Sequence, residues 1–184
     1  SLREPLHRVA LQREFEHLPG VKLVEGHLQV PATLTALGSN GERSRQVVLS
    51  GLPRNPILEN PLRLNPGLTE RLTPEQEGLF LSDKLARLLG VGVGDLVEVS
   101  PRRGTRRSVQ FPVLGLVDTW LGLGAFLNID ILSRAVGEHA VADKILLQVE
   151  PEARADLVAS LAERPQVLGV TWRSDSLREM NKLM

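Results

Sequence analysis

Hydrophobic residues recur at helical spacing near the start of the chain and at strand spacing directly after it. Leu11, Phe15 and Leu18 lie on one face of a helix predicted over residues 7–18, which a Pro-Gly pair then ends. Apolar residues next alternate with polar ones, and an Asn-Gly pair at 40–41 gives a strong hairpin signal. The first quarter therefore predicts one helix, one strand and a β-hairpin. The predicted strands are VKLVEG, HLQVPATLTALGS and RSRQVVLSGL.

Prolines break this regular pattern in the segment that follows residue 53. Pro56, Pro61, Pro66 and Pro74 are spaced so that no long helix fits between them. We expect this segment to cross between two lobes, with at most a short helical turn in it. Two short helices are expected beyond it, the first capped by Ser82 and the second by Asp130. The strands predicted in this part are GLFLS, DLVEVS, SVQFPVLGLVD and GAFLN.

The last section of the chain predicts a β-α-β unit and the start of one more helix. ADKILLQVE is the first strand, PEARADLVASLAER is the helix with Pro151 in its first turn, and QVLGVTWRS is the second strand. SDSLREMNKLM then begins a capped helix. The whole pattern predicts an α+β fold of two lobes. A discontinuous α+β lobe comprises residues 1–54 and 141–184, and a β-rich lobe of residues 55–140 is inserted into it.

Glycines at alternating positions, Gly90, Gly92 and Gly94, raise the question of a phosphate-binding loop. Such a loop runs from a strand through the glycines into a helix, whose N-terminal N–H groups then face the anion. Here the predicted helix comes first and the strand second, so the glycines meet a helix C-terminus with its partial negative charge. The sequence therefore predicts a helix cap at Gly90 and a tight turn at Gly94-Asp95, not a nucleotide site.

Composition and charge disfavour several classes of protein. The chain has 22 Lys and Arg against 22 Asp and Glu, so it lacks the basic excess typical of nucleic-acid binding. It contains no cysteine, which excludes disulfides, thiolate metal sites and cysteine nucleophiles. Only 3% of the residues are aromatic, too few for a stacking surface that binds single-stranded nucleic acid. We therefore expect no nucleic-acid partner.

No group of residues has the spacing of a metal or catalytic site. The four histidines, His7, His17, His27 and His139, form no local metal motif and are expected to be scattered over the surface. No serine lies in a Gly-x-Ser-x-Gly motif. The sequence therefore predicts no catalytic residue, no cofactor and no metal ion. A Ser-His-Asp site that is assembled only in space stays open as an alternative.

Two segments are candidate contact surfaces. Trp120, Leu121, Leu123 and Phe126 form an apolar turn that either meets a partner protein or folds back as a lid on the core of the inserted lobe. The segment PRRGTRR packs four arginines around a glycine, which would suit a lipid headgroup or a phosphate. At zero net charge, a solvated hairpin tip explains this segment better.

Several short motifs, taken in order, resemble one protein family. The matching strings are LPGVKLVEG, VVLSGLP, EGLFLSDKLARLLGVGVGD, GLVDTWLGLGAFLNIDILSRAVGE and ERPQVLGVTWR. Their order and spacing, over nearly the whole chain, are similar to the extracytoplasmic domain of FtsX-like ABC transporter permeases, the MacB-like periplasmic core domain.

This resemblance implies a fold, a location and partners. The implied fold is a discontinuous porter-like α+β lobe with an inserted β-rich lobe, on the periplasmic or cell-surface side of an inner or plasma membrane protein. Both ends of the sequence are expected to lead into membrane-spanning helices. The implied partners are a cytoplasmic ABC ATPase, reached through the full-length permease, and a lipoprotein or periplasmic adaptor. The implied role is non-catalytic: to bind substrate or partner and transmit ATP-driven motion. A stand-alone ligand-binding protein or hydrolase is the alternative.

Overall fold

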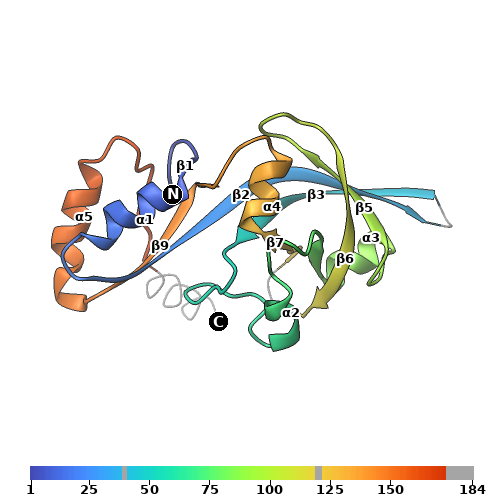
Figure 1. The fold of residues 1–184 in the computed structure, drawn as a ribbon, viewed down its shortest axis with the longest axis horizontal. Coiled ribbons are helices and arrows are strands. Elements are labelled where there is room, and N and C mark those ends of the chain that lie inside the picture. Colours follow the sequence, from blue (N-terminus) through green and yellow to red (C-terminus); the bar gives the residue numbers. More distant parts are fainter. Residues whose placement is uncertain (39–40, 119–121, 173–184) are drawn as a thin grey trace, which may run out of the picture.

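The computed structural model describes residues 1–38, 41–118 and 122–172, and it confirms the predicted α+β fold (Figure 1). Most strands lie in one sheet, and short helices pack against it. The elements in chain order are β1 (Leu6–His7), α1 (Arg8–Glu16), β2 (Val21–Gly38), β3 (Gly41–Leu52), α2 (Pro66–Glu70), β4 (Leu79–Ser82), α3 (Asp83–Leu89), β5 (Leu96–Pro101), β6 (Val109–Val117), β7 (Ala125–Asn128), α4 (Ile129–Ala135), β8 (Val141–Ala142), β9 (Lys144–Val149), a 3-10 turn (Pro151–Ala153) and α5 (Arg154–Ala162).

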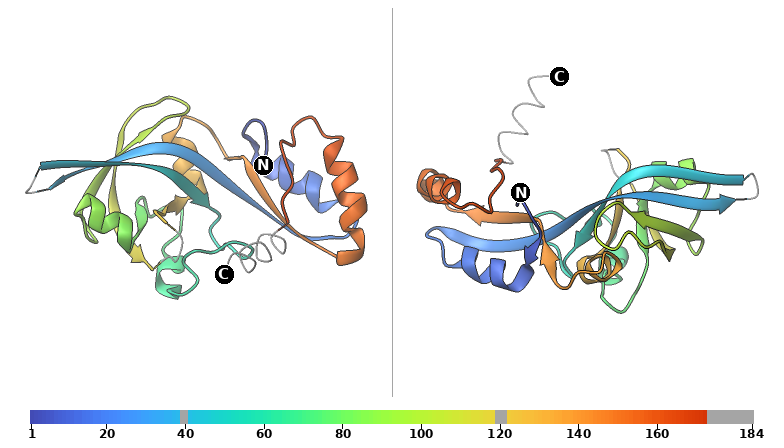
Figure 2. Two further views of the ribbon diagram at one scale, coloured as in Figure 1. Left: turned by 180° about the vertical axis from the view of Figure 1, so that it is seen from behind. Right: turned by 90° about the horizontal axis from the view of Figure 1, so that it is seen from above.

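The molecule is elongated, with a lobe at each end and β2 running through both (Figure 1). The terminal lobe contains α1, α5, β9 and Val21–Gly26 of β2, together with the segments 1–3 and 163–172. The strand-rich lobe contains β3 to β7, α2 to α4 and Leu28–Gly38 of β2. Seen from above in Figure 2, β9 and the first part of β2 run between α5 on one side and α1 on the other.

A closed ring of six strands builds the strand-rich lobe. The strands pair in the order β3-β7-β4-β6-β5-β2, and β2 also pairs with β3, which closes the ring into a small barrel. Alternate residues of β2 point into it, as the sequence predicts, because side chains alternate across a strand. These inward residues, all fully or almost fully buried, are Leu28, Val30, Ala32, Leu34 and Ala36.

The predicted strands VKLVEG and HLQVPATLTALGS are one continuous strand. β2 has 18 residues and crosses Gly26 without a break. Its first part pairs with β9, from Val21↔Val149 to His27↔Lys144, and its later part pairs with β3 and β5. The hairpin of residues 28–52, which the prediction placed in the first lobe, therefore pairs with strands of the inserted lobe. The division at residues 54 and 140 into separate units stays a prediction.

Local capping follows the sequence at α3 but not at α4. Ser82 Oγ accepts a hydrogen bond from the Leu85 amide, and Gly90 ends α3 in the left-handed conformation at φ 70°, as predicted. The cap of α4 is Asn128 and not Asp130, because the Asn128 side chain accepts from the Asp130 amide at 2.9 Å. Asp130 lies within the first turn of the helix, where its carboxylate is free to bind another residue.

The Pro-rich segment has a small core of its own. It contains only the five-residue helix α2, as its proline spacing predicts. Leu62 and Leu72 are fully buried against Leu52, Phe80 and Val117 of the barrel wall. This cluster holds the segment against the outside of the barrel.

The second strand of the predicted β-α-β unit is not formed. Of QVLGVTWRS, Val167 makes only an isolated antiparallel bridge with Leu2, and the segment to Trp172 has no strand conformation. The segment pairs instead with the N-terminal residues: Arg3 N–H donates to Gln166 at 2.9 Å, and Leu168 N–H donates to Ser1 at 2.9 Å. The backbone pairing of this segment ends at Ser1, the first described residue. The predicted helix at SDSLREMNKLM and the last two residues of QVLGVTWRS lie outside the described residues.

Candidate functional site

A buried carboxylate occupies the place where β2 passes from one lobe to the other. Glu25 is only 6% exposed, and its carboxylate accepts hydrogen bonds from three successive backbone amides, those of Ile57, Leu58 and Glu59. The shortest of these, from Ile57 to Oε2, is 2.6 Å. Burial would raise the pKa of Glu25, but the hydrogen bonds from His27 and from these amides outweigh it and lower the pKa. Glu25 is therefore a carboxylate that anchors the Pro-rich segment.

His27 corrects the prediction that all four histidines are on the surface. Its ring is 2% exposed, and Nε2 lies 2.5 Å from Oε1 of Glu25. Because the carboxylate can only accept, Nε2 of His27 carries the hydrogen. The sequence offered one signal for this pair: Glu25 and His27 are two residues apart in a strand and therefore lie on the same face of it. His7, His17 and His139 are exposed, as predicted.

Three ion pairs surround this point and connect segments far apart in the sequence. Arg8 of α1 binds Asp130 of α4 at 2.8 Å, and Lys144 of β9 binds Glu59 of the Pro-rich segment at 2.6 Å. Arg103, from the turn between β5 and β6, binds Asp143 at 2.8 Å. We call these residues together the lobe junction: Arg8, Glu25, His27, Ile57–Glu59, Arg103, Asp130, Asp143 and Lys144.

Gly26 allows the lobe junction to close tightly. A Cβ at this position would lie 3.2 Å from Cγ of Arg8 and 3.3 Å from Cβ of Ala142. Both distances are shorter than ordinary van der Waals contact, so a larger residue would push α1 or β8 away from β2. The glycine therefore allows Arg8 and Ala142 to pack closely on the face of β2 opposite to the side chains of Glu25 and His27.

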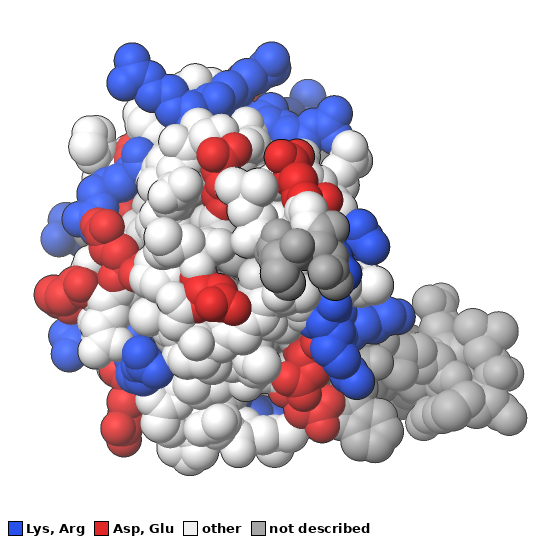
Figure 3. All heavy atoms as spheres, turned by 90° about the vertical axis from the view of Figure 1, so that its right-hand side faces the viewer, with Lys and Arg blue, Asp and Glu red and all other residues white. Residues whose placement is uncertain are grey.

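The basic turn is held to the rest of the protein through Arg103, unlike the solvated tip that the sequence predicts. Besides Asp143, its guanidinium binds Glu138 at 3.5 Å and the carbonyl of Gln29 at 3.2 Å. The segment is thus not a fully solvated tip, since one of its four arginines is fixed at the lobe junction. Arg102, Arg106 and Arg107 are exposed, as predicted. Figure 3 shows charges of both signs mixed over the hairpin end of the molecule.

The predicted apolar contact surface is only partly visible. Trp120 and Leu121 lie outside the described residues. Leu123 is half-buried and packs against the main core, while the half-buried Phe126 packs against the cluster of Leu52, Phe80 and Val117. The described pair thus contacts the barrel, and the role of this turn as a partner surface stays a prediction.

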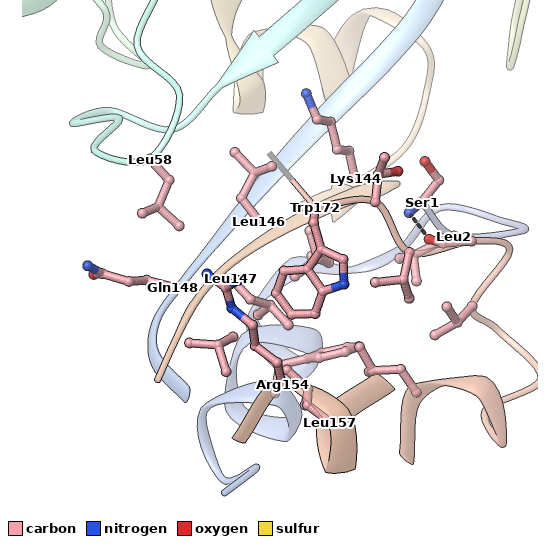
Figure 4. Close-up of a pocket in the computed structure, with 18 residues that line it drawn as sticks. Ser1, Leu2, Leu58, Lys144, Leu146, Leu147, Gln148, Arg154, Leu157 and Trp172 are labelled. Carbon is pink, nitrogen blue, oxygen red and sulfur yellow. Dashed lines mark hydrogen bonds between the residues drawn. The ribbon is translucent and has the colours of Figure 1, made fainter. Parts of the chain in front are cut away.

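A groove of about 410 Å³ lies in the terminal lobe (Figure 4). It runs along β9, every residue of which lines it, and the segment Val167–Trp172 forms the opposite wall. Phe15 of α1 and Leu157 and Leu161 of α5 form its apolar floor. At its mouth the Arg154 guanidinium lies 5.0 Å from the ring centroid of Trp172. We call this feature the β9 groove; the sequence analysis did not predict it.

The contacts of the histidine and acidic side chains in the described part of the chain bear on catalysis and metal binding. The histidine rings there bind Glu25 and the carbonyl of Arg13, and neither contact involves a hydroxyl nucleophile. Within the same residues, no three His, Asp or Glu side chains are close enough to share a metal ion. No helix of the described chain combines the length and the apolar character that crossing a membrane requires.

Comparisons with known proteins find similarity at the level of fold alone. No protein-family model and no curated protein sequence matches this chain. The periplasmic region of MacB from Actinobacillus actinomycetemcomitans has a similar structure, with a TM-score of 0.57 and 10% identity over 99% of this chain and 86% of that one. So does the extracellular domain of YknZ, a noncanonic ABC-type transporter from Gram-positive bacteria, with a TM-score of 0.52 and 14% identity over 85% of this chain and 78% of that one.

These comparisons define the class of fold. The chain has the fold of the periplasmic and extracellular domains of ABC transporters such as MacB and YknZ. The fold that the sequence resemblance implied is thereby confirmed.

Proposed function

We propose that this chain is the non-catalytic extracytoplasmic domain of an ABC transporter permease, on the periplasmic or cell-surface side of the membrane. The observation that carries the proposal is the likeness in fold, over 99% of the chain, to the periplasmic region of MacB. Two structures of ABC transporter domains, from different proteins, share the architecture. Fold alone does not define function, so the proposal also draws on the geometry of the chain.

The positions of the first and last described segments support this role. The Ser1 amino group donates to the Gly169 carbonyl at 3.0 Å, so the two segments lie side by side in the terminal lobe. This arrangement suits a domain that is held by two membrane helices, because both connections can then reach the same membrane. In the proposed role the terminal lobe faces the membrane and the β2–β3 hairpin points away from it (Figure 1).

The proposed partners follow from this role. A cytoplasmic ATPase binds and hydrolyses ATP, and the membrane helices carry the resulting motion to this domain. The domain transmits it to a transported substrate, a lipoprotein or a periplasmic adaptor, and the turn with Trp120, Leu121, Leu123 and Phe126 is the proposed contact surface. The domain itself needs no cofactor and no metal ion.

Cysteine labelling in the full-length protein tests the location. The chain contains no cysteine, so Leu37→Cys introduces the single thiol of this domain, at a residue that is 84% exposed, and the unchanged full-length protein gives the background labelling. A membrane-impermeant maleimide should label this variant in intact cells. Leu81→Cys, at a fully buried position, is the matched control and should react only after denaturation. Labelling of the Leu37→Cys variant only after lysis would place the domain in the cytoplasm and reject the proposal.

Calorimetry tests whether ATP binds to the ATPase alone and not to this domain. The isolated chain should show no heat of binding when it is titrated with ATP and Mg²⁺, because its glycine run lies at the C-terminus of α3 and not at a helix N-terminus. Saturable binding of ATP would contradict the proposed role.

A further inference from the structure

The β9 groove follows the edge of a strand and does not cross one face of the sheet. All six residues of β9 line it, although their side chains point alternately to both faces. β9 is the last strand in the order of the sheet, and β2 is its neighbour on the other side. Its residues are half-buried or exposed throughout, even though four of the six are Ile, Leu or Val. Along the described chain, β9 is thus an apolar strand with an open edge.

A short ladder already leads into the groove. Leu2 N–H donates to the carbonyl of Asp143, directly before β9, at 2.8 Å. On its other side, the Ser1–Arg3 segment exchanges backbone hydrogen bonds with Gln166, Leu168 and Gly169. The Leu2↔Val167 bridge is antiparallel. Ser1–Arg3 therefore lies between β9 and the segment that forms the opposite wall, as a central strand would.

The two walls continue past Ser1 on the N-terminal side. One is β9 from Lys144 to Val149, and the other is the segment Val167–Trp172, of which Val167 and the residues 169–172 line the groove and Val170 is 43% exposed. Figure 4 shows Leu147, Leu157 and Trp172 around the space between them, with Ser1 and Leu2 at one end. The groove thus has the direction and the apolar surface that one more extended strand would cover.

Charged ligands suit the groove less well. Of the cations that line it, Lys144 is paired with Glu59 at 2.6 Å, and Arg154 lies over the ring of Trp172. An anion would have to compete with Glu59 for Lys144. An extended segment with apolar side chains could occupy the groove while Lys144 and Arg154 keep their present contacts.

We propose that the β9 groove receives a β-strand that runs directly into Ser1 and lies antiparallel to β9 and to Val167–Trp172. The occupant is a segment of the same polypeptide, because Ser1–Arg3 already holds the entrance in register. This inference rests on the proposed function in one respect, namely that the domain belongs to a longer permease chain. The added strand completes the sheet that the predicted β-α-β unit leaves unfinished, and it joins the lobe directly to the preceding membrane segment.

The register of Leu2 fixes the side-chain pattern of the occupant. Leu2 is 8% exposed and belongs to the core. Because side chains alternate along a strand, the residues two, four and six positions before Leu2 also point toward Phe15, Leu157 and Leu161. These positions require apolar residues, whereas the positions between them face the other side of the sheet.

A pair of fusions with one composition tests the proposal in the isolated chain. The in-register variant carries Thr-Val-Thr-Val-Thr-Val before Ser1, which places a valine at each inward position. The shifted variant carries Val-Thr-Val-Thr-Val-Thr, which turns every valine outward. The unextended chain is the baseline against which the folding and the stability of both fusions are compared.

The in-register fusion should slow hydrogen exchange of the β9 amides by about tenfold and, for a chain of this size, raise the melting temperature by about 3–6 °C. The shifted fusion should leave both unchanged. Equal effects of the two fusions, or none from either, would overturn the proposal. Stabilisation that occurs only in a dimer would assign the groove to a second copy and also overturn it. Since neither membrane nor ATPase is involved, these results do not depend on the labelling test of the proposed function.

Discussion

The guanidinium of Arg8 lies 2.8 Å from the carboxylate of Asp130, and this ion pair joins α1 of the terminal lobe to α4 of the strand-rich lobe. The two side chains are 20% and 33% exposed, so water screens them only in part. The stem of Arg8 also covers Gly26. The pair therefore fixes the lobes to one another at the point where β2 is most crowded.

Arg8→Met should destabilise the protein by about 1 kcal/mol, because it removes the charge but keeps most of the apolar stem. Urea unfolding measures the loss, which should shrink at high salt. The matched control is Lys22→Met, since Lys22 and Glu150 form an ion pair in which both side chains are more than half exposed. That variant should change stability little. An equal loss in both variants would show that the lobe junction gives the Arg8 pair no special strength.

Glu25→Gln should destabilise the protein by about 2–4 kcal/mol. The amide has one oxygen in place of two, and its NH₂ group would face backbone N–H groups that need an acceptor. Glu42→Gln, at an exposed position of β3, is the control and should have almost no effect. Urea unfolding at pH 7 compares the two, and a similar small loss in both would contradict the anchoring role of Glu25.

Stability should fall in acid, and Glu25 should account for part of the fall. Its pKa in the folded state lies below the ordinary value of 4.5. The unfolded state therefore binds the proton more readily, and the stabilisation is complete above pH 4.5 and is lost as the pH falls through the folded-state pKa. Unfolding free energies between pH 7 and pH 3 should drop less steeply for Glu25→Gln than for the unchanged chain. Parallel curves would contradict this assignment.

Gly104→Ala should cost about 1–3 kcal/mol more than Gly122→Ala. Both glycines have a left-handed backbone, with φ values of 70° and 72°, so the backbone strain is the same in both variants. Only at Gly104 would the new Cβ collide, at 2.1 Å from the carbonyl oxygen of Val136; at Gly122 nothing lies within 4 Å. Thermal unfolding measures the difference. Equal losses would mean that the basic turn does not pack against the end of α4 as described.

Local signals in the sequence predicted much of the fold. Alternation along β2, the cap at Ser82, the left-handed glycine at position 90 and the short helix in the Pro-rich segment depend on neighbouring residues, and the structure confirms all four. The closure of the barrel was not predictable in this way. It depends on β3 pairing with both β2 and β7, and no spacing along the chain specifies the second partner.

The lobe junction escaped prediction for a related reason. Glu25 meets amides more than 30 residues away, and Arg103 meets Asp143 across 40 residues. Hydrogen-bond partners at such separations are set by the folded chain and not by a motif. The segment QVLGVTWRS was predicted as a strand that the structure does not form. Its sequence pattern favours a strand, but a strand also needs a hydrogen-bonded neighbour along its length. Ser1–Arg3 supplies such a neighbour for only a few residues.

The continuity of β2 has a mechanical consequence. Eighteen residues in extended conformation span roughly 60 Å, with no loop along the way that could absorb a displacement. A strand paired along both halves resists bending more than a flexible linker does. In the proposed role, a push or twist applied where β2 pairs with β9 would therefore be transmitted along the strand to the part that pairs with β3.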